Sequence, residues 1–279
     1  MKKLIFAAAF TISAALSFGQ TNSEKKPTVQ LVRNATLLIE YGGKKILVDP
    51  MLSPKGAIDS WAGIQKNPTI ELKMPVEDVV KGVDLVLVTH THEDHFDKVA
   101  SGTLNKSIEL MIQPADKEYF QKEGFNNAIV VDGNKLWNGI DIYRVDGEHG
   151  TGEVLKMMGK TSGFILKAKN QPTVYIVGDA LWTDNIKNNI KKFKPDYIIV
   201  NSGGALIKGF ENSPIIMDEA QTMALIRERG KAKVIAVHMD ALDHCRTTRS
   251  SLTKKADELN VSKDKLIIPQ DAEVITLSL

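Results

Sequence analysis

The feature that most constrains how this chain folds is a set of metal-ligand residues placed just beyond an apolar segment. Three histidines and an aspartate follow the segment Val83–Val88 in the pattern H-x-H-x-D-H. We predict the segment to be a buried strand and the pattern to be the loop at its end. Residues two apart in extended backbone project to the same side, so His90 and His92 can bind one ion. The chain then tightens toward a helix, which can turn Asp94 and His95 onto a second ion about 3.5–4 Å away.

Three further apolar runs also end in residues that can bind metals. The runs and the residues after them are Ile140–Val145 with Asp146–His149, Thr173–Val177 with Asp179, and Lys233–Val237 with His238. Imidazole and carboxylate ligands suit zinc, manganese or iron, and they leave room for the water that a catalytic site requires. Any one of these histidines alone is better explained as a core or surface residue with satisfied hydrogen bonds. The complete set predicts a metal centre.

The order of the expected elements indicates an α/β fold in two similar halves. Strands are expected at 29–33, 37–41, 45–49, 83–88, 108–113, 128–131, 140–145, 161–168, 173–178, 196–200, 233–237, 266–268 and 274–277, and helices at 97–104, 115–123, 183–193, 217–229 and 250–259. Gly42-Gly43 is the expected hairpin turn between the second and third strands. Sheets surrounded by helices, with ligands drawn from both halves, imply a four-layer αββα sandwich with the active site at one edge, where the loops converge.

These residues resemble the metallo-β-lactamase superfamily, and the resemblance covers nearly all of the chain beyond its amino-terminal segment. It implies a first metal held by His90, His92 and His149, and a second held by Asp94, His95 and His238, with Asp179 bridging the two. The phrases Ile46–Pro50 and His95–Asp97 are similar to the branch that contains ascorbate-phosphate lactonase and the N-acyl phosphatidylethanolamine phospholipase D type of hydrolase.

This ligand set predicts a metal-dependent hydrolase. Two divalent ions, with zinc expected and manganese or iron as alternatives, lower the pKa of a shared water and make a hydroxide nucleophile, and one of them polarises the scissile oxygen. Two other branches of the family are less similar to this chain. Redox flavodiiron members carry the pattern H-x-E-x-D, with glutamate at the position of His92. The β-lactamases of this fold carry cysteine or serine at the position of Asp179. We expect cleavage of a lactone, amide or phosphodiester in a small-molecule substrate. The alternative is a non-catalytic metal-binding or sensing domain with the same ligands.

Several polar residues near the ligands have two interpretations each. Asp94 is predicted to be catalytic as well as a ligand. His244, six residues beyond His238, either protonates the leaving group or only donates a hydrogen bond to a carbonyl. Asp49 and Asp97 either accept hydrogen bonds from ligand imidazoles or serve as cap and turn residues.

Three other segments are also ambiguous. The single cysteine, Cys245, cannot form an internal disulfide and is interpreted as a small buried apolar residue. Asn201–Gly204 either lets substrate approach backbone amides or forms a turn. The long loop Met51–Lys73 is either a lid over the metals, with Trp61 and Met51 as substrate walls, or a packed surface excursion.

The amino terminus predicts export. Two lysines precede the apolar stretch Leu4–Leu16, and small residues stand at positions minus three and minus one before Gln20, so residues 1–19 are typical of a signal peptide and too short to span a membrane. Residues 20–27 would be a tether and residues 28–279 the hydrolase domain. The rival, a buried first helix, is disfavoured because residues 21–26 are polar. We expect a periplasmic or secreted protein with no integral membrane segment after cleavage.

Charge argues against a nucleic-acid partner. Removing residues 1–19 deletes two lysines and no acidic residue, so 34 basic residues face 34 acidic ones and the formal charge falls from +2 to zero. Nucleic-acid binders usually show a basic stripe. The densest basic runs here, such as Lys191-Lys192, are interpreted as solvated helix faces. The oligomeric state is left open.

Overall fold

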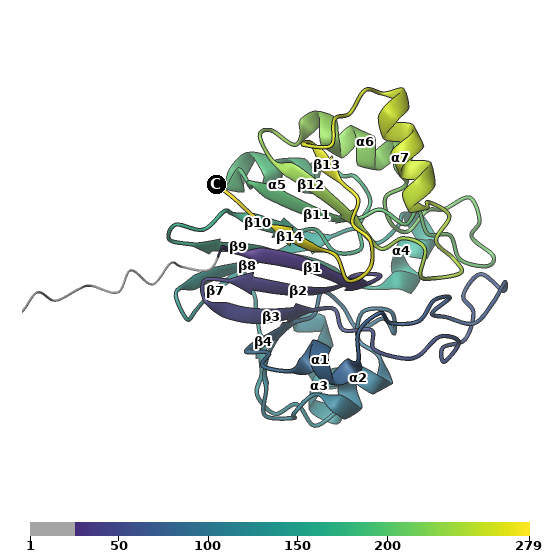
Figure 1. The fold of residues 1–279 in the computed structure, drawn as a ribbon. Coiled ribbons are helices and arrows are strands. Elements are labelled where there is room, and N and C mark those ends of the chain that lie inside the picture. The colour runs from purple at the N-terminus through teal and green to yellow at the C-terminus, as the bar shows by residue number, and fades with distance from the viewer. Residues whose placement is uncertain (1–25) are drawn as a thin grey trace, which may run out of the picture.

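Two seven-stranded β-sheets face each other in the computed structural model, which describes residues 26–279 (Figure 1). The first sheet has the order β14 (Val274–Thr276), β1 (Thr28–Arg33), β2 (Thr36–Tyr41), β3 (Lys44–Val48), β4 (Leu85–Leu87), β5 (Glu109–Ile112) and β6 (Ala128–Val130). The second has the order β13 (Leu266–Ile267), β12 (Lys233–Val237), β11 (Tyr197–Asn201), β10 (Val174–Ile176), β9 (Thr161–Ala168), β8 (Ile140–Gly147) and β7 (Asn134–Trp137). The predicted signal peptide and most of the predicted tether lie outside the described residues.

Helices cover the outer face of each sheet. The helices of the described residues are α1 (Val76–Val80), α2 (Lys98–Thr103), α3 (Lys117–Lys122), α4 (Gly152–Met158), α5 (Asp184–Phe193), α6 (Glu219–Glu228) and α7 (Arg249–Glu258), with a 3-10 turn at Pro114–Asp116. Helix α4 lies apart from the two outer layers (Figure 1), and its Met158 lines the cavity described below. Phe120 of α3 packs with Val86 of β4 in one apolar cluster, and Ile190 of α5 packs with Ile198 of β11 in another. Figure 1 shows α1 to α3 on one side of the sheet pair and α5 to α7 on the other. The predicted four-layer αββα sandwich is confirmed.

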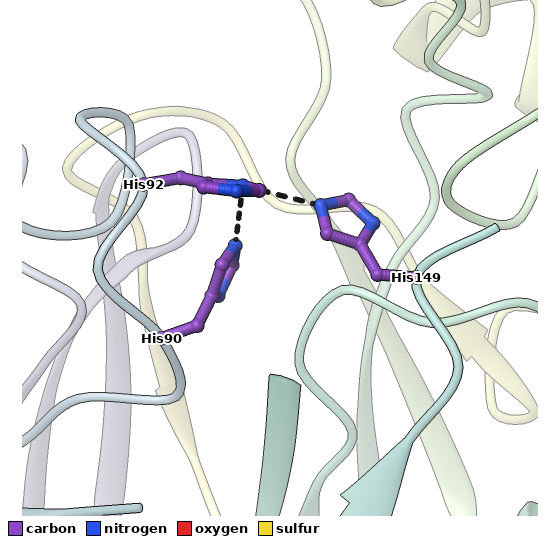
Figure 2. Close-up of side chains that lie close together, drawn as sticks. All are labelled: His90, His92 and His149. Carbon is purple, nitrogen blue, oxygen red and sulfur yellow. Dashed lines mark hydrogen bonds between the residues drawn. The ribbon is translucent and has the colours of Figure 1, made fainter. Parts of the chain in front are cut away.

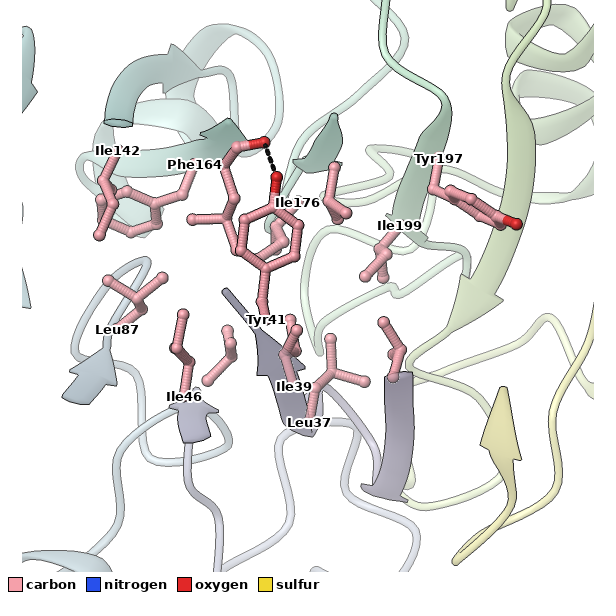
Figure 3. Close-up of a cluster of buried hydrophobic side chains, with 14 of the residues drawn as sticks. Leu37, Ile39, Tyr41, Ile46, Leu87, Ile142, Phe164, Ile176, Tyr197 and Ile199 are labelled. Carbon is pink, nitrogen blue, oxygen red and sulfur yellow. Dashed lines mark hydrogen bonds between the residues drawn. The ribbon is translucent and has the colours of Figure 1, made fainter. Parts of the chain in front are cut away.

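The main core lies between the two sheets (Figure 3). Along β2, Leu37, Ile39 and Tyr41 point into this core, whereas Leu38 points to the helical layer. This alternation follows from the two-residue period of a strand, and here both faces are apolar because both are covered. The Tyr41 hydroxyl donates a hydrogen bond to the Pro172 carbonyl (2.8 Å), so its polar end is satisfied inside the core.

Strand direction brings the ligand-bearing loops to one edge. Strands β3 to β6 run parallel, as do β10 to β13. Strand β8 is antiparallel to β9, which is antiparallel to β10, so β8 and β10 point the same way. The loops after β4, β8, β10 and β12 carry the predicted ligands. The carboxyl ends of parallel strands are where α/β sheets place their ligand sites.

Most predicted elements are present, with small differences at their ends. The hairpin turn Gly42-Gly43 has φ of +58° and +73°, as a tight two-residue connection requires. Three elements were not predicted: α1, α4 and β7. The first two are short, and the exposed polar residues of edge strand β7 show no apolar alternation. Within residues 26–279, no helix is both long enough and apolar enough to cross a bilayer.

Candidate metal centre

All seven predicted ligands converge at the loop edge, in two adjacent clusters. The first contains His90, His92 and His149, and the second contains Asp94, His95, Asp179 and His238. Within each cluster the possible ligand atoms all lie within 4.8 Å of one another. Six of the seven residues are buried, and His92 is half-buried. The loop after β4 supplies four of them from the first sheet, and the loops after β8, β10 and β12 supply three from the second.

Three imidazole nitrogens meet in the first cluster (Figure 2). His92 Nδ1 lies 3.0 Å from His90 Nε2 and 3.3 Å from His149 Nε2. His149 donates from Nδ1 to the Ile215 carbonyl (2.8 Å), so its neutral ring carries no proton on Nε2. His90 Nδ1 lies 3.1 Å from the Thr89 hydroxyl, a contact that leaves its Nε2 free as well. Lone pairs directed at one point are the arrangement that a metal ion needs.

The rings of the first cluster are held in the neutral form. Burial lowers the pKa of His90 well below its usual value and also lowers the pKa of His92. Burial likewise lowers the pKa of His149 to about 4. Metals bind the neutral imidazole, so no proton has to leave these rings at neutral pH before an ion binds.

Asp179 lies between the two clusters. Its Oδ2 is 3.2 Å from His95 Nε2 and 3.5 Å from His149 Nε2, so one oxygen contacts a ring of each cluster. Its Oδ1 is 3.6 Å from His238 Nε2. On the other side of the second cluster, Asp94 Oδ2 is 3.2 Å from the same His238 nitrogen. Asp179 therefore occupies the position of a bridging carboxylate.

The second cluster is strongly charged. Burial opposes a charge on His95 and His238, but the surrounding carboxylates, Asp179 foremost, outweigh it and raise both histidine pKa values well above the usual range. These imidazoles in turn hold the pKa of Asp94 and Asp179 low despite their burial. His95 Nε2 is buried and makes no hydrogen bond of normal geometry among the described residues. An unpartnered nitrogen facing two carboxylates fits a divalent cation in place of the ring protons.

Asp49 fixes the orientation of one ligand. Its Oδ2 accepts hydrogen bonds from His95 Nδ1 and the Thr89 hydroxyl, and its Oδ1 accepts one from the Thr89 amide, all at 2.8 Å. Once an ion takes the place of the Nε2 proton, the remaining proton of His95 is held on Nδ1, and Nε2 faces the cluster. The interpretation of Asp49 as a partner of a ligand imidazole is confirmed.

Asp97 caps a helix, which is the second of the two roles considered for it. Its Oδ1 accepts a hydrogen bond from the Ala100 amide (2.8 Å), which caps the amino terminus of α2, and its Oδ2 accepts one from the Ser53 amide (2.6 Å). The suggestion that it contacts a ligand imidazole is wrong. A helix that starts immediately after the ligand loop uses this carboxylate for its own free amides.

Two asparagines support the carboxylate ligands in a way that the sequence did not indicate. Asn201 Nδ2 donates to Asp179 Oδ1 (2.6 Å). Asn34 Nδ2 donates to the Asp94 carbonyl (3.1 Å), and the Asn34 carbonyl accepts from the His238 amide (2.9 Å). The positive φ of Asn34, +58°, places it in the turn between β1 and β2. No local pattern reveals these contacts, because each joins segments that are distant in sequence.

A cavity of about 390 Å³ lies over the clusters. Ligands of both clusters line it, together with His244 and one Lys or Arg side chain, Lys208. The apolar lining residues are Trp61, Met158, Ile207 and Ile215. The cavity has the size and the mixture of apolar walls and convergent polar groups of a small-molecule site.

Comparison with known proteins agrees with this geometry. The Beta-lactamase superfamily domain matches residues 44–239, which include every predicted ligand. The chain belongs to this superfamily. The predicted membership of the metallo-β-lactamase superfamily is therefore confirmed, and the resemblance to the lactonase and phospholipase branch stays a prediction.

The similarity between this superfamily member and its relatives covers almost its whole length. The UPF0173 protein YddR of Bacillus subtilis is 34% identical over 251 residues, which are 88% of this chain and 98% of that protein. The crystal structure of a possible metal-dependent hydrolase from Veillonella parvula has a TM-score of 0.86 and 34% identity, covering 90% of this chain and 100% of its own. That of an isothiocyanate hydrolase from Delia radicum gut bacteria has a TM-score of 0.83 and 33% identity, with the same coverage. As predicted, the chain is a metal-dependent hydrolase of the superfamily.

The long loop after β3 of this superfamily member packs against the rest of the protein and lines the cavity with one side chain. Trp61 lines the cavity, as expected, but Met51 is fully buried against Ala241 and Leu242, so its predicted role as a substrate wall is wrong. The buried Arg33 guanidinium donates to three carbonyls of the loop, those of Met51, Ser53 and Ile70. Tethered in this way at both ends, the loop is a packed excursion with one side chain in the cavity.

His244 reaches the cavity, and its neighbours explain its state. Its ring lies edge-on to the ring of Trp61, with 4.9 Å between the ring centroids. Burial lowers the pKa of His244 to about 4. Its Nδ1 is buried and has no hydrogen-bond partner among the described residues, so the predicted alternative of a bond to a carbonyl is not seen at that atom. Its catalytic role stays a prediction. The next residue, Cys245, is half-buried, and its Sγ lies 3.5 Å from His238 Nδ1, so it contacts a ligand ring rather than filling apolar space alone.

Asn201–Gly204 does not contact the cavity. All four residues are buried, and none of them lines the cavity. A Cβ on Gly203 would lie 2.3 Å from the His238 carbonyl oxygen. Glycine is therefore required for close packing against the ligand-bearing end of β12, and the interpretation of this segment as a substrate-binding backbone is wrong.

Proposed function

We propose that this protein is an exported hydrolase that uses two divalent metal ions, zinc by expectation, to cleave a small substrate at an electrophilic carbon. The observation that carries the proposal is a pair of ligand clusters that share Asp179 beneath a cavity of about 390 Å³. Export rests on the signal-peptide pattern of residues 1–19. The protein would work in the periplasm or outside the cell.

Each ion has a defined set of residues to hold it. The first set is His90, His92 and His149, the second is Asp94, His95 and His238, and Asp179 serves both. Two bound ions supply Lewis acidity to the scissile bond and lower the pKa of water toward neutrality. Asp49 and Asn201 hold their ligands in place before the ions arrive, so little reorganisation is needed on binding.

His244 would act on the substrate from the cavity wall. With a pKa lowered to about 4 by burial, its ring is neutral at pH 7 and carries one N–H. A neutral ring is a poor proton donor but a good hydrogen-bond donor to negative charge that develops on the substrate. We therefore favour hydrogen bonding over the general-acid role that its sequence position suggested.

The cavity walls favour carbon electrophiles over phosphodiesters. Sites for phosphoryl groups usually add Arg or Lys clamps to their metals. Here Lys208 is the one Lys or Arg among the cavity residues, and it is exposed, whereas four of the other lining side chains are apolar. Lactones, amides and isothiocyanates present an uncharged electrophilic carbon. The similar isothiocyanate hydrolase supports the inclusion of the last class.

One experiment tests the proposal. The mature protein is stripped with a chelator, reloaded with zinc, manganese or iron, and assayed on lactone, amide, isothiocyanate and phosphodiester panels, with metal content measured alongside. We expect about two ions per chain and turnover of an uncharged carbon electrophile that the stripped protein lacks. Failure to take up metal would refute the assignment of the two clusters as metal sites. Turnover confined to phosphodiesters would overturn the substrate class, and full metal uptake without any turnover would identify a binding or sensing domain.

A further inference from the structure

A single carboxylate organises the segment that carries Trp61, residues 59–67, called here the Trp61 loop. Asp243 follows β12, and its side chain is completely buried. It accepts hydrogen bonds from four backbone amides of the loop, those of Trp61 (3.3 Å), Ala62 (3.3 Å), Ile64 (3.2 Å) and Gln65 (3.5 Å). The amides of the loop thus converge on one anion, in the manner of a backbone nest.

Two side chains of the Trp61 loop complete this contact. The Ser60 hydroxyl donates to Asp243 Oδ2, and Asn67 Nδ2 donates to Asp243 Oδ1 (2.9 Å). Asn67 Oδ1 accepts in return from the Asp243 amide (2.8 Å). Burial opposes the charge, but these hydrogen bonds outweigh it and lower the pKa of Asp243 to about 2. The carboxylate is therefore charged throughout the pH range of an enzyme assay.

A few other contacts also hold the Trp61 loop. Within it the Ile64 amide donates to the Ser60 hydroxyl as well (3.0 Å), and Asn67 Nδ2 donates to the Asp59 carbonyl (3.4 Å). At its base, Ile58 and Asn67 exchange two backbone hydrogen bonds (2.7 and 2.8 Å), and at its middle the Trp61 carbonyl accepts from the Lys208 amide (3.1 Å). Amides turned inward must find an acceptor, because an unpaired buried N–H is costly. Asp243 is the acceptor that the amides of Trp61, Ala62, Ile64 and Gln65 share, so the conformation of the loop depends on its charge.

The loop matters because of what it presents to the cavity. The Trp61 ring forms one wall and contacts the ring of His244, the residue that directly follows Asp243. Asp243 itself makes no hydrogen bond to any of the seven ligands in the described chain. Its removal should therefore change the wall without changing the metal site.

We propose that Asp243 is a positioning residue for substrate selection: it holds the Trp61 loop over the metal centre so that the Trp61 ring limits the size of the substrate. The kinetic part of this inference rests on the proposed hydrolase function, whereas the structural part does not. Two measurements test the structural part and the kinetic part separately.

The first measurement is hydrogen exchange of the loop amides in metal-loaded protein. In Asp243→Asn, a near-isosteric change, and in Asp243→Ala, the four amides that donate to Asp243 should exchange at least tenfold faster, with metal content unchanged. Formate can fill the space left in the alanine variant and should restore protection, whereas formamide should not. The control is Asp59→Asn, which removes an exposed carboxylate of the same loop that pairs with Lys66. Unchanged exchange in both Asp243 variants, or equal rescue by formamide, would overturn the proposal.

The second measurement compares a small and a bulky substrate with the same scissile bond. Asp243→Ala should raise KM for the small substrate and should reduce the preference for small over bulky substrate, the ratio of the two kcat/KM values, at least tenfold. Trp61→Ala should produce the same loss, and the double variant should add nothing further, because both changes remove one wall. Unaltered preference in either single variant, or additive losses, would refute substrate selection by this contact. If the wild type cleaves no substrate, the hydrolase proposal fails, and the exchange data alone decide whether Asp243 holds the loop.

Discussion

Replacement of Asp49 by asparagine should weaken metal binding at the second cluster by about 10- to 100-fold. In the native protein Oδ2 accepts from His95 Nδ1 and the Thr89 hydroxyl, and Oδ1 accepts from the Thr89 amide. Asparagine has one acceptor oxygen in place of two. Its NH₂ group must face either the Thr89 amide, which also donates, or His95 Nδ1.

The backbone at Thr89, two residues beyond β4, is fixed because its carbonyl accepts a hydrogen bond from the Ser162 amide (3.1 Å), so the NH₂ group should face His95. It then donates to His95 Nδ1, and the ring proton moves to Nε2, the atom that lies 3.2 Å from Asp179 Oδ2. A protonated Nε2 offers no lone pair to an ion. Restoring the useful tautomer places two donors face to face, at a cost of about 1–3 kcal/mol for a buried unsatisfied group. At about 1.4 kcal/mol per factor of ten, this cost agrees with the expected loss of affinity.

Competition titrations of metal-free protein against a chromophoric chelator measure this loss. Asp97→Asn is the matched control, since it alters a buried carboxylate that caps α2 and contacts no ring. It should cost about 1 kcal/mol of folding stability and leave metal affinity unchanged. Wild-type affinity in Asp49→Asn, or equal losses in the two variants, would refute the tautomer argument.

Three further predictions follow from the site and the amino terminus. Asp179→Asn should lower turnover at least 100-fold and reduce metal content while the circular dichroism spectrum is unchanged, because a bridging oxygen is lost without loss of volume; wild-type rate and metal content would contradict the bridging role. His244→Ala should lower kcat by about 10²–10³ for good and poor leaving groups alike, as expected for loss of a hydrogen bond to developing charge. Losses confined to poor leaving groups would identify a general acid instead. Mass spectrometry of exported protein should find Gln20 as the first residue, and a chain that retains Met1 would count against the signal peptide.

The sequence predicted which residues converge at the sheet edge because these candidate ligands follow apolar runs. A buried strand such as β4 is visible as a continuous hydrophobic segment, and a histidine or aspartate beyond it is then placed at the sheet edge. This reasoning needs only local information. It applied equally to Asp179 after β10 and His238 after β12.

The residues that support the ligands and the cavity wall could not be predicted in this way. Asn34 reaches Asp94 and His238, and Asp243 reaches the Trp61 loop, through segments that are adjacent only after folding. Met51 was misplaced for a related reason. The buried Arg33 guanidinium draws the start of the loop into the protein interior, and no local pattern signals a pairing of that kind.

The division of the candidate ligands between two sheets would link metal supply to the lifetime of the protein. His90 and His92 belong to the loop of the first sheet, whereas His149 belongs to the second, so an unfolded or half-folded chain cannot offer either complete set. An ion that binds only the folded chain stabilises it by about 2.7 kcal/mol when its free concentration is 100 times the Kd. Proteases that cleave transiently opened chains would then destroy the protein fastest where free metal is scarce. Resistance to proteolysis should therefore rise with the concentration of free metal, before any substrate is present.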